Sequence, residues 1–267
     1  MRFSVYTIDG KRTGHIDLAR LFSIPIRDDV IKKAVLAERA AARQPYGRDE
    51  LAGKRTSAHY HGLRHYRWTM MNREMARMKR IHHQGYLEWT ARFVPQAVKG
   101  RLAHPPLVEK VWKQKINKKE RILALLSAAS ATAIPQLVKN RGHKLENVQL
   151  PIIVEDDIEA IKKAKELEAF LKKIGLEHEI ERIRKTKQRA GKGKRRGRRI
   201  IKRKGPLIVI KKDRGIGLIS SIPGIDIVNA EKLTVSHLAP GTTPGRLCIW
   251  SKGACEFIDK LGEKIGG

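Results

Sequence analysis

Short apolar runs, most of them in the second half of the chain, predict the strands of a sheet. Phe3 and Val5 alternate with Ser4 and Tyr6, which predicts a first strand that is partly apolar on both faces. Four further short runs of β-branched or other apolar residues predict strands at 150–154, 207–210, 225–228 and 247–250. Continuous runs of this kind suit strands that are covered on both faces.

Apolar residues at helical spacing fill the intervals between these runs. Asp28 or Asp29 can cap the first expected helix, and Asn117 with Glu120 can cap the second, which Pro135 should end or kink. Asp157 can cap a third helix over 157–174, which Gly175 ends, and Ser251 can cap the last one. A fourth helix is expected to carry Leu176, Ile180 and Ile183. Strands that alternate with helices predict an α/β fold: a single globular domain with a mainly parallel sheet flanked by helices.

Charge changes the picture, because it is segregated along the chain. The sequence has 57 Lys and Arg against 27 Asp and Glu, a formal net charge of +30 in 267 residues. Residues 43–115 have 16 basic and 5 acidic residues, and residues 187–204 have 11 basic residues and no acidic one. We therefore expect the globular domain to consist of 1–42 and 116–267, with a basic loop at 187–204. Its partner should be a polyanion.

The first basic segment, 43–115, has no sustained apolar stripe and is far longer than an ordinary connection. It contains 8 of the 14 aromatic residues and 6 of the 10 histidines. Arginine next to aromatic residues suits RNA, because guanidinium groups bind phosphates and aromatic rings stack on unpaired bases. A small aromatic core within the segment is the alternative interpretation. Part of 67–80 is also compatible with a short helix that has a basic face.

The second basic segment, 187–204, places three glycines among its cations. Gly191, Gly193 and Gly197 allow the backbone to adopt positive φ and to approach phosphates closely. Because so many like charges repel one another, a bound anion is the favoured interpretation, and a solvated flexible loop is the alternative.

No catalytic arrangement stands out. The spacing of a phosphate-binding loop and the dinucleotide fingerprint are both absent, so we expect neither enzyme activity nor a cofactor. His59 with His61, and His82 with His83, lack Cys or carboxylate partners at ligand spacing, and no metal site is expected. Asp156 and Asp157 would suit a metal-dependent nuclease, but capping of a helix explains them without a metal.

Other features exclude a membrane or secreted protein. The longest uncharged run, 122–138, has 17 residues and suits a packed helix, since a bilayer span needs about 20. The first residues lead directly into strand-like alternation, so no secretory signal is expected. Cys248 and Cys255 are expected to be buried thiols in a reducing compartment.

Several stretches, read in order, resemble the archaeal and eukaryotic family of large-subunit ribosomal protein four. They run almost from end to end of the chain and comprise 44–58, 94–101 with 104–106, 116–120, 189–194, 238–241 and 244–247. The resemblance implies a globular α/β domain on the outer part of the large ribosomal subunit. It also implies a long loop that threads through ribosomal RNA and lines the narrow part of the nascent-peptide exit tunnel.

Carried over to this chain, the loop is 43–115, with 43–58 outbound, 93–115 returning and the tip within 59–92. Met75-Ala76-Arg77-Met78-Lys79-Arg80 looks like the family's Met-Ala-Arg-Val-Pro-Arg motif with Lys79 in place of proline, and the stretch before it has more aromatics and fewer glycines. The residues expected at the tip are His59, Tyr60, His61, Tyr66, Trp68, Arg77 and Arg80.

Charge and resemblance together predict an RNA-binding structural constituent of the large ribosomal subunit that supports its assembly in the cytoplasm. Its expected partners are large-subunit rRNA, neighbouring ribosomal proteins and the nascent peptide. A non-ribosomal RNA chaperone and a nuclease are the alternatives. The residues expected to bind RNA are Arg43, Arg48, Lys54, Arg55, Arg64, Arg67, Arg77, Lys79, Arg80, Arg92, Lys99, Arg101, Arg189, Lys192, Lys194, Arg195, Arg196, Arg198 and Arg199.

Overall fold

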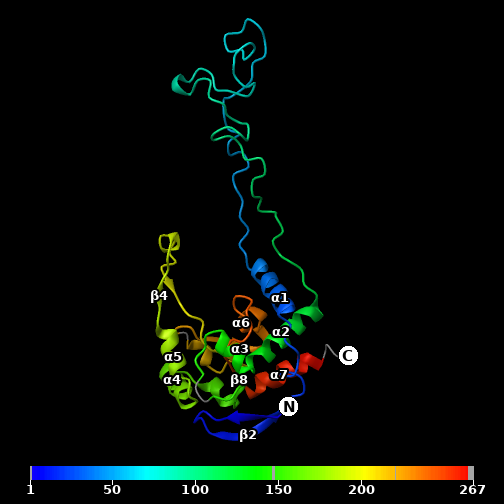
Figure 1. Cartoon of the computed structure of the whole chain (residues 1–267), viewed down its shortest axis with the longest axis vertical. Coiled ribbons are helices and arrows are strands. Elements are labelled where there is room, and N and C mark those ends of the chain that lie inside the picture. Colours follow the sequence, from blue (N-terminus) through cyan, green and yellow to red (C-terminus); the bar gives the residue numbers. More distant parts are fainter. Residues whose placement is uncertain (1, 146–147, 220, 264–267) are drawn as a thin grey trace. The chain divides into compact units, whose positions relative to one another are not determined.

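The chain divides into two compact units. In the computed structural model, which describes residues 2–145, 148–219 and 221–263, the globular unit consists of Met1–Ala41 with Lys113–Gly267, and the loop unit is Ala42–Trp112. Figure 1 shows the regular helices and strands of the globular unit and the mostly irregular chain of the loop unit. The loop unit contains one short 3₁₀ helix, η1 (Gly85–Leu87), among its described residues.

A six-stranded sheet forms the centre of the globular unit. Its strands, in spatial order, are β2 (Arg12–Asp17), β1 (Arg2–Tyr6), β3 (Ile152–Val154), β8 (Cys248–Ser251), β6 (Leu207–Ile210) and β7 (Asp226–Asn229). Only β1 and β2 pair antiparallel, and every other pair in this sheet is parallel. The predicted mainly parallel sheet is therefore confirmed, and each expected strand is present.

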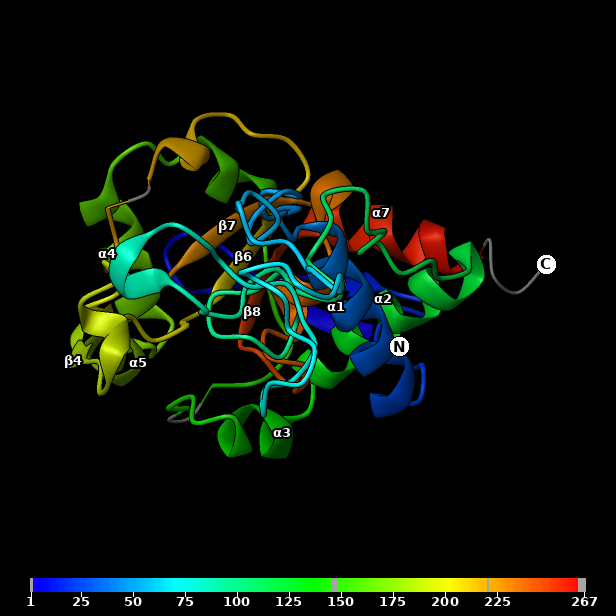
Figure 2. The same cartoon turned by 90° about the horizontal axis from the view of Figure 1, so that it is seen from above.

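Helices cover both faces of the sheet, because alternate strand residues point to opposite sides. Ile153 and Trp250 face one apolar core, whereas Ile152 and Ile249 face the other. The first core is closed by α1 (Asp28–Ala41), α2 (Lys118–Thr132), α6 (Val235–Leu238) and α7 (Lys252–Glu263), and the second by α3 (Pro135–Asn140), α4 (Ala164–Lys173) and α5 (Glu177–Arg184). Figure 2 shows β6 and β8 with α4 and α5 on one side and α1, α2 and α7 on the other.

The expected helix over 157–174 is wrong as a single element. The structure has a 3₁₀ helix, η2 (Asp156–Ala160), and then α4. Ile161 and Lys163 adopt extended backbone angles between them, although Ile161 remains buried. An apolar stripe at helical spacing therefore continued across a break in the helix. Gly175 does follow the end of α4, with a φ of +92°, as expected for a C-terminal glycine.

The helix caps agree only in part with the sequence. Asn117 precedes α2 but makes no side-chain capping bond, and Glu120 instead pairs with Lys33 at 2.8 Å. Pro135 separates α2 from α3 and is the first residue of α3, which confirms the expected break. The Ser251 hydroxyl accepts a hydrogen bond from the Ala254 amide at 3.2 Å, so the expected cap of α7 is also confirmed.

Smaller elements complete the globular unit. They are β4 (Lys187–Gln188) and β5 (Ile200–Ile201), which pair antiparallel, and the 3₁₀ helices η3 (Lys192–Lys194), η4 (Ile216–Leu218) and η5 (Ala230–Lys232).

Cys248 and Cys255 are buried free thiols, as expected, and burial raises the pKa of the Cys248 thiol to about 12. Among the described residues, no helix has both the length and the apolar character needed to cross a bilayer.

Candidate nucleic-acid interface

The outbound and returning segments of the loop unit, 43–58 and 93–112, lie side by side and are here called its two strands, although neither is a β-strand. The Arg48 amide donates to the Pro106 carbonyl at 3.2 Å, and the rings of Tyr46 and Trp112 stack with centroids 5.8 Å apart. Gly53 has a φ of +79°, and a Cβ there would lie 2.5 Å from the Gly100 carbonyl oxygen. The two strands therefore approach each other closely enough to need glycine at this point.

Cations lie against aromatic rings at the base of the loop unit. The Arg43 guanidinium lies 3.9 Å from the centre of the Trp112 ring, and the Lys110 ammonium lies 4.5 Å from it. These contacts order the two cations while both side chains stay exposed. Positive charge is thus presented to solvent in a defined position.

Further along the loop unit, cations surround a hollow of about 620 Å³. Arg55, Arg92 and Lys99 line it together with Gly53, Thr56, Ser57, Ile81 and Gln84. Arg55 forms a two-pronged ion pair with Asp49, and Arg92 donates to the Val98 carbonyl at 2.7 Å. No acidic residue lines the hollow, so its charge suits an anion such as a phosphate group.

The centre of the loop unit contains a small buried cluster of rings. Trp68 and His82 are buried, with ring centroids 5.2 Å apart, and Trp89 contacts both. The alternative interpretation, a small aromatic core, is therefore confirmed for these residues. The four tyrosines of the loop unit, Tyr46, Tyr60, Tyr66 and Tyr86, are all exposed, although Tyr46 stacks on Trp112 and Tyr66 lies against His61. The short helix considered for part of 67–80 is absent, because the described backbone there consists of turns and bends.

Most residues expected to bind RNA lie on the surface. All are exposed except Arg80, Arg92, Arg101 and Arg189, which are half-buried. Arg80 donates to the Trp89 carbonyl at 2.8 Å and to the Ala76 carbonyl at 3.1 Å. Its guanidinium therefore holds two parts of the loop unit together and has fewer donors left for a ligand than an exposed arginine has.

The residues expected at the tip differ in their surroundings. Tyr60, Tyr66 and Arg77 are exposed, whereas Trp68 is buried in the ring cluster. His59 and His61 lie close to His82, with all three pairs of ring centroids within 5.1 Å. His59 with His61 and His82 with His83 stand out in the sequence as separate pairs, but the 21 positions between His61 and His82 hide the convergence of three of these histidines.

One cation in the loop unit was missed by sequence reasoning. Arg73 lies 4.3 Å from the centre of the Trp89 ring and donates to the Arg67 carbonyl at 3.2 Å. Trp68 follows Arg67 directly in the sequence, whereas no aromatic residue adjoins Arg73, so the contact of Arg73 with Trp89 left no mark in the sequence. Lys79, which was expected, lies 4.2 Å from the Phe93 ring centre.

The second basic segment is an ordered hairpin, here called the basic hairpin (187–204). It leaves the domain beside α5, where Figure 1 shows it in yellow with β4 at its base. The Arg189 amide donates to the Arg199 carbonyl at 2.8 Å, and η3 lies at the turn. Gly191 and Gly197 adopt positive φ, as predicted, whereas Gly193 does not. A tight hairpin therefore presents Lys192, Lys194, Arg195, Arg196, Arg198 and Arg199 to solvent.

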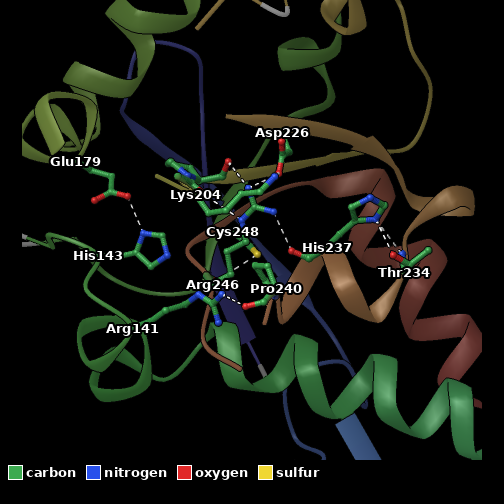
Figure 3. A network of polar contacts seen from close by, with 12 residues as sticks. Arg141, His143, Glu179, Lys204, Asp226, Thr234, His237, Pro240, Arg246 and Cys248 are labelled. Carbon is green, nitrogen blue, oxygen red and sulfur yellow. Dashed lines mark hydrogen bonds and ion pairs between the residues drawn. The ribbon is translucent and has the colours of Figure 1, made fainter. Parts of the chain in front are cut away.

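A buried arginine fixes the end of the basic hairpin to the domain. Arg246 is 1% exposed and donates to the carbonyls of Gly205 and His237 and to the Asp226 carboxylate at 2.7 Å. Asp226 also pairs with Lys204, the last residue of the hairpin, at 2.9 Å. Figure 3 shows this network. Arg246 belongs to one of the stretches that resemble the ribosomal family, and its contacts explain it as a structural residue.

A second buried group lies beside this network. His143 and Glu179 are buried, with His143 Nδ1 2.6 Å from the carboxylate (Figure 3). Arg182 pairs with the same carboxylate at 2.7 Å. Burial opposes ionisation of Glu179, but hydrogen bonds from Arg182 and His143 outweigh it and lower the pKa of Glu179. Arg182 also donates to the Lys204 carbonyl at 2.7 Å, so this group stabilises the base of the hairpin as well.

The carboxylate pair Asp156–Asp157 has a structural position. The Asp156 carboxylate accepts a hydrogen bond from the Gly253 amide at 2.8 Å, near the start of α7, and Asp157 is exposed. The expected capping thus acts on α7, not on the helix that follows Asp157. In the described parts of the chain, the one metal-competent group of three or more His, Cys, Asp or Glu residues is His59, His61 and His82.

Comparisons with known proteins give one consistent result. The model of the ribosomal protein L4/L1 family matches residues 16–261. The large ribosomal subunit protein uL4 of Nanoarchaeum equitans is 46% identical over 264 residues, covering 97% of each chain. The proteins of the same name from Methanopyrus kandleri and Methanocaldococcus jannaschii are 43% and 45% identical, each covered completely, over 98% and 99% of this chain.

Proposed function

The chain belongs to the ribosomal protein L4/L1 family, and from this premise we propose that it is a structural component of the large ribosomal subunit that binds ribosomal RNA. The observation that carries the RNA-binding role is the distribution of its cations. The excess of positive charge gathers on two segments, 43–115 and 187–204, which have 27 basic and 5 acidic residues and in which few apolar residues are buried. We infer a binding role with no catalytic step and a cytoplasmic location within the ribosome.

Two kinds of contact support RNA as the ligand. The hollow lined by Arg55, Arg92 and Lys99 and the arginines of the basic hairpin present donors to phosphate oxygens. Exposed rings such as Tyr60 and Tyr86 offer faces on which unpaired bases can stack. Phosphate neutralisation supplies affinity and the rings favour single-stranded regions, which are abundant in a folded ribosomal RNA.

The loop unit is proposed to thread into the folded RNA, with 59–92 at the exit tunnel next to the nascent peptide. This follows from the family resemblance of its two strands and of 75–80. Binding at sites where RNA helices converge would neutralise phosphates that repel one another, and so would support assembly of the subunit. The globular unit would then contact RNA and neighbouring ribosomal proteins at the surface.

Substitution of the hairpin arginines tests the RNA-binding role. Arg195, Arg196, Arg198 and Arg199, all changed to Ala, should reduce the slope of log affinity against log salt by about 3–4, since each phosphate contact contributes nearly one. Affinity for a large-subunit rRNA fragment, measured by filter binding from 50 to 200 mM salt, should fall by more than about 10-fold at the lower salt concentration.

A charge-matched variant provides the control. Lys32, Arg39, Lys162 and Lys165 are exposed on helices or loops of the globular unit, outside the hairpin. Changing these four to Ala removes the same net charge, so it should lower affinity much less if the hairpin is a local contact. Equal loss in the two variants, or a slope unchanged by the hairpin substitutions, would refute the assignment of the hairpin to RNA.

A further inference from the structure

Three histidines of the loop unit converge at one point. His59, His61 and His82 each have a ring nitrogen within 4.8 Å of those of the other two. They come from two segments that pair through an antiparallel bridge, in which the amides of His59 and Arg80 each donate to the other's carbonyl. Backbone pairing therefore fixes the relative position of the segments before any ligand binds.

Three ring nitrogens of this cluster are buried without a hydrogen-bond partner. His82 is 5% exposed, and neither of its ring nitrogens makes a hydrogen bond. His61 Nε2 is buried without a partner as well. A buried polar atom without a partner has lost its hydrogen bonds to water, and packing alone does not offset that loss. Two unsatisfied imidazoles that face a third one are the arrangement expected of ligands to a cation.

The third histidine is already oriented. His59 Nδ1 lies 2.8 Å from the Ser57 carbonyl oxygen, to which it donates in the neutral ring. That bond places the proton on Nδ1 and leaves Nε2 with a free lone pair, as in metal sites whose histidines donate to a backbone carbonyl. His59 is exposed, so the cluster is accessible from solvent.

We propose that His59, His61 and His82 form a binding site for a divalent transition-metal ion, with zinc as the expected occupant. Imidazole nitrogens suit zinc, cobalt, nickel and copper and bind magnesium or calcium poorly. In tetrahedral zinc sites, bonds of about 2.0–2.1 Å place the nitrogens roughly 3.4 Å apart, so the rings need to move by about 1 Å. A water molecule or a phosphate oxygen would take the fourth position.

The site would cross-link the loop unit at the base of its tip. It would connect the segment that enters the tip at His59–His61 with the segment that leaves it at His82, closing a loop of about 20 residues. Closing such a loop lowers the entropy of the free chain and so stabilises the folded arrangement. In a cationic unit, an anionic fourth ligand such as phosphate would be favoured over water.

Metal titration of the full chain tests the site. The untagged, RNA-free protein, kept at high salt, is titrated with Co²⁺, whose visible absorption is intense in tetrahedral coordination, and then with Zn²⁺ as competitor. We expect one equivalent of Co²⁺ to bind and Zn²⁺ to displace it. His59→Ala and His82→Ala should each weaken metal binding by more than about 10-fold. Loss of a residue that only orients a metal ligand already weakens metal affinity by about 10-fold, and loss of a ligand should weaken it more.

Controls separate loss of a ligand from loss of the fold. His104→Ala removes an exposed histidine of the same unit that is outside the cluster, and it should bind as the parent does. Because His82 is buried, its variant is checked by circular dichroism, while exposed His59 can be replaced with little effect on packing. Failure of the parent to bind either metal at micromolar concentration would overturn the proposal. Equal binding in parent and His59→Ala, or equal loss in His104→Ala, would do so too.

Discussion

A few buried polar side chains stabilise the attachment of the basic hairpin. Arg246 is the clearest, because its guanidinium is enclosed and bonds to two carbonyls and a carboxylate from three different segments. Arg141 lies nearby, and burial, with the adjacent Arg246, lowers the pKa of Arg141 to about 10, so Arg141 remains charged at neutral pH. Some arginines of this cationic protein are therefore buried and stabilise the fold, whereas others are exposed and can bind an anion.

Replacement of Arg246 measures how much this buried arginine contributes to the stability of the globular unit. Arg246→Met should decrease the free energy of unfolding of the globular unit by about 3–5 kcal/mol, because Asp226 and the carbonyls lose their buried partner. Urea unfolding followed by circular dichroism gives the value. Arg39→Ala, at an exposed position on α1, is the control and should change it by less than about 0.5 kcal/mol. Similar values for the two variants would show that Arg246 is not structural.

Protonation of His143 should couple stability to pH. Burial lowers the pKa of His143 below its usual 6.5, despite the neighbouring carboxylate of Glu179. Below pH 6.5 the unfolded chain therefore binds a proton at this residue before the folded chain does, and stability falls as the pH is lowered from 7 to 5. His143→Asn keeps a donor for Glu179 but does not titrate, so its stability should fall less steeply.

Thermal unfolding at several pH values measures both slopes. His237, whose pKa burial also lowers, contributes a part of the pH dependence that the variant retains. If His143→Asn keeps the slope of the parent, this buried histidine is not the group that links stability to pH.

At the level of elements, regular patterns were read correctly and irregular ones were not. Continuous apolar runs located β3, β6, β7 and β8, because strands covered on both faces need such residues. β2 was missed since it is an edge strand with mostly exposed, polar residues. The break between η2 and α4 was missed because the buried Ile161 continues the apolar stripe through extended backbone.

The glycine at the close approach of the loop strands offers a test at this scale. In Gly53→Ala, the new Cβ meets the Gly100 carbonyl, and the φ of +79° costs an alanine about 1–2 kcal/mol. The two strands should separate locally, so limited proteolysis should cut within 43–58 faster than in the parent. Gly14→Ala, where a Cβ meets nothing within 4 Å, should leave the digestion unchanged. Equal rates of cleavage in Gly53→Ala and the parent would contradict the close approach of the two segments at Gly53.

The basic hairpin illustrates what charge alone predicts. The run of cations identified a surface for anions, and two of its glycines adopt the expected positive φ. Its ordered shape could not be inferred, because the pairing of β4 with β5 rests on four residues and on contacts of Arg182 and Arg246 far along the chain. Long-range polar contacts leave no periodic signal in a sequence.

For the whole molecule, segregation of charge was the most informative property of the sequence. It separated the cationic segments from a globular α/β domain without any knowledge of the fold. What it missed was internal order within the loop unit, where Trp68, His82 and Trp89 form a buried cluster. The aromatic residues of the loop unit have two roles, since some pack together in its interior and others remain exposed, where a ligand can reach them.

A protection map of large-subunit rRNA tests the central claim most directly. Hydroxyl-radical cleavage is compared for RNA alone, RNA with the full chain, the hairpin variant lacking its four arginines, and a loop-unit variant with Arg64, Arg67 and Arg77 changed to Ala. The account predicts two distinct sets of protected nucleotides, one weakened by each variant while the other persists. A map without protection, or with the same protections in every variant, would contradict it.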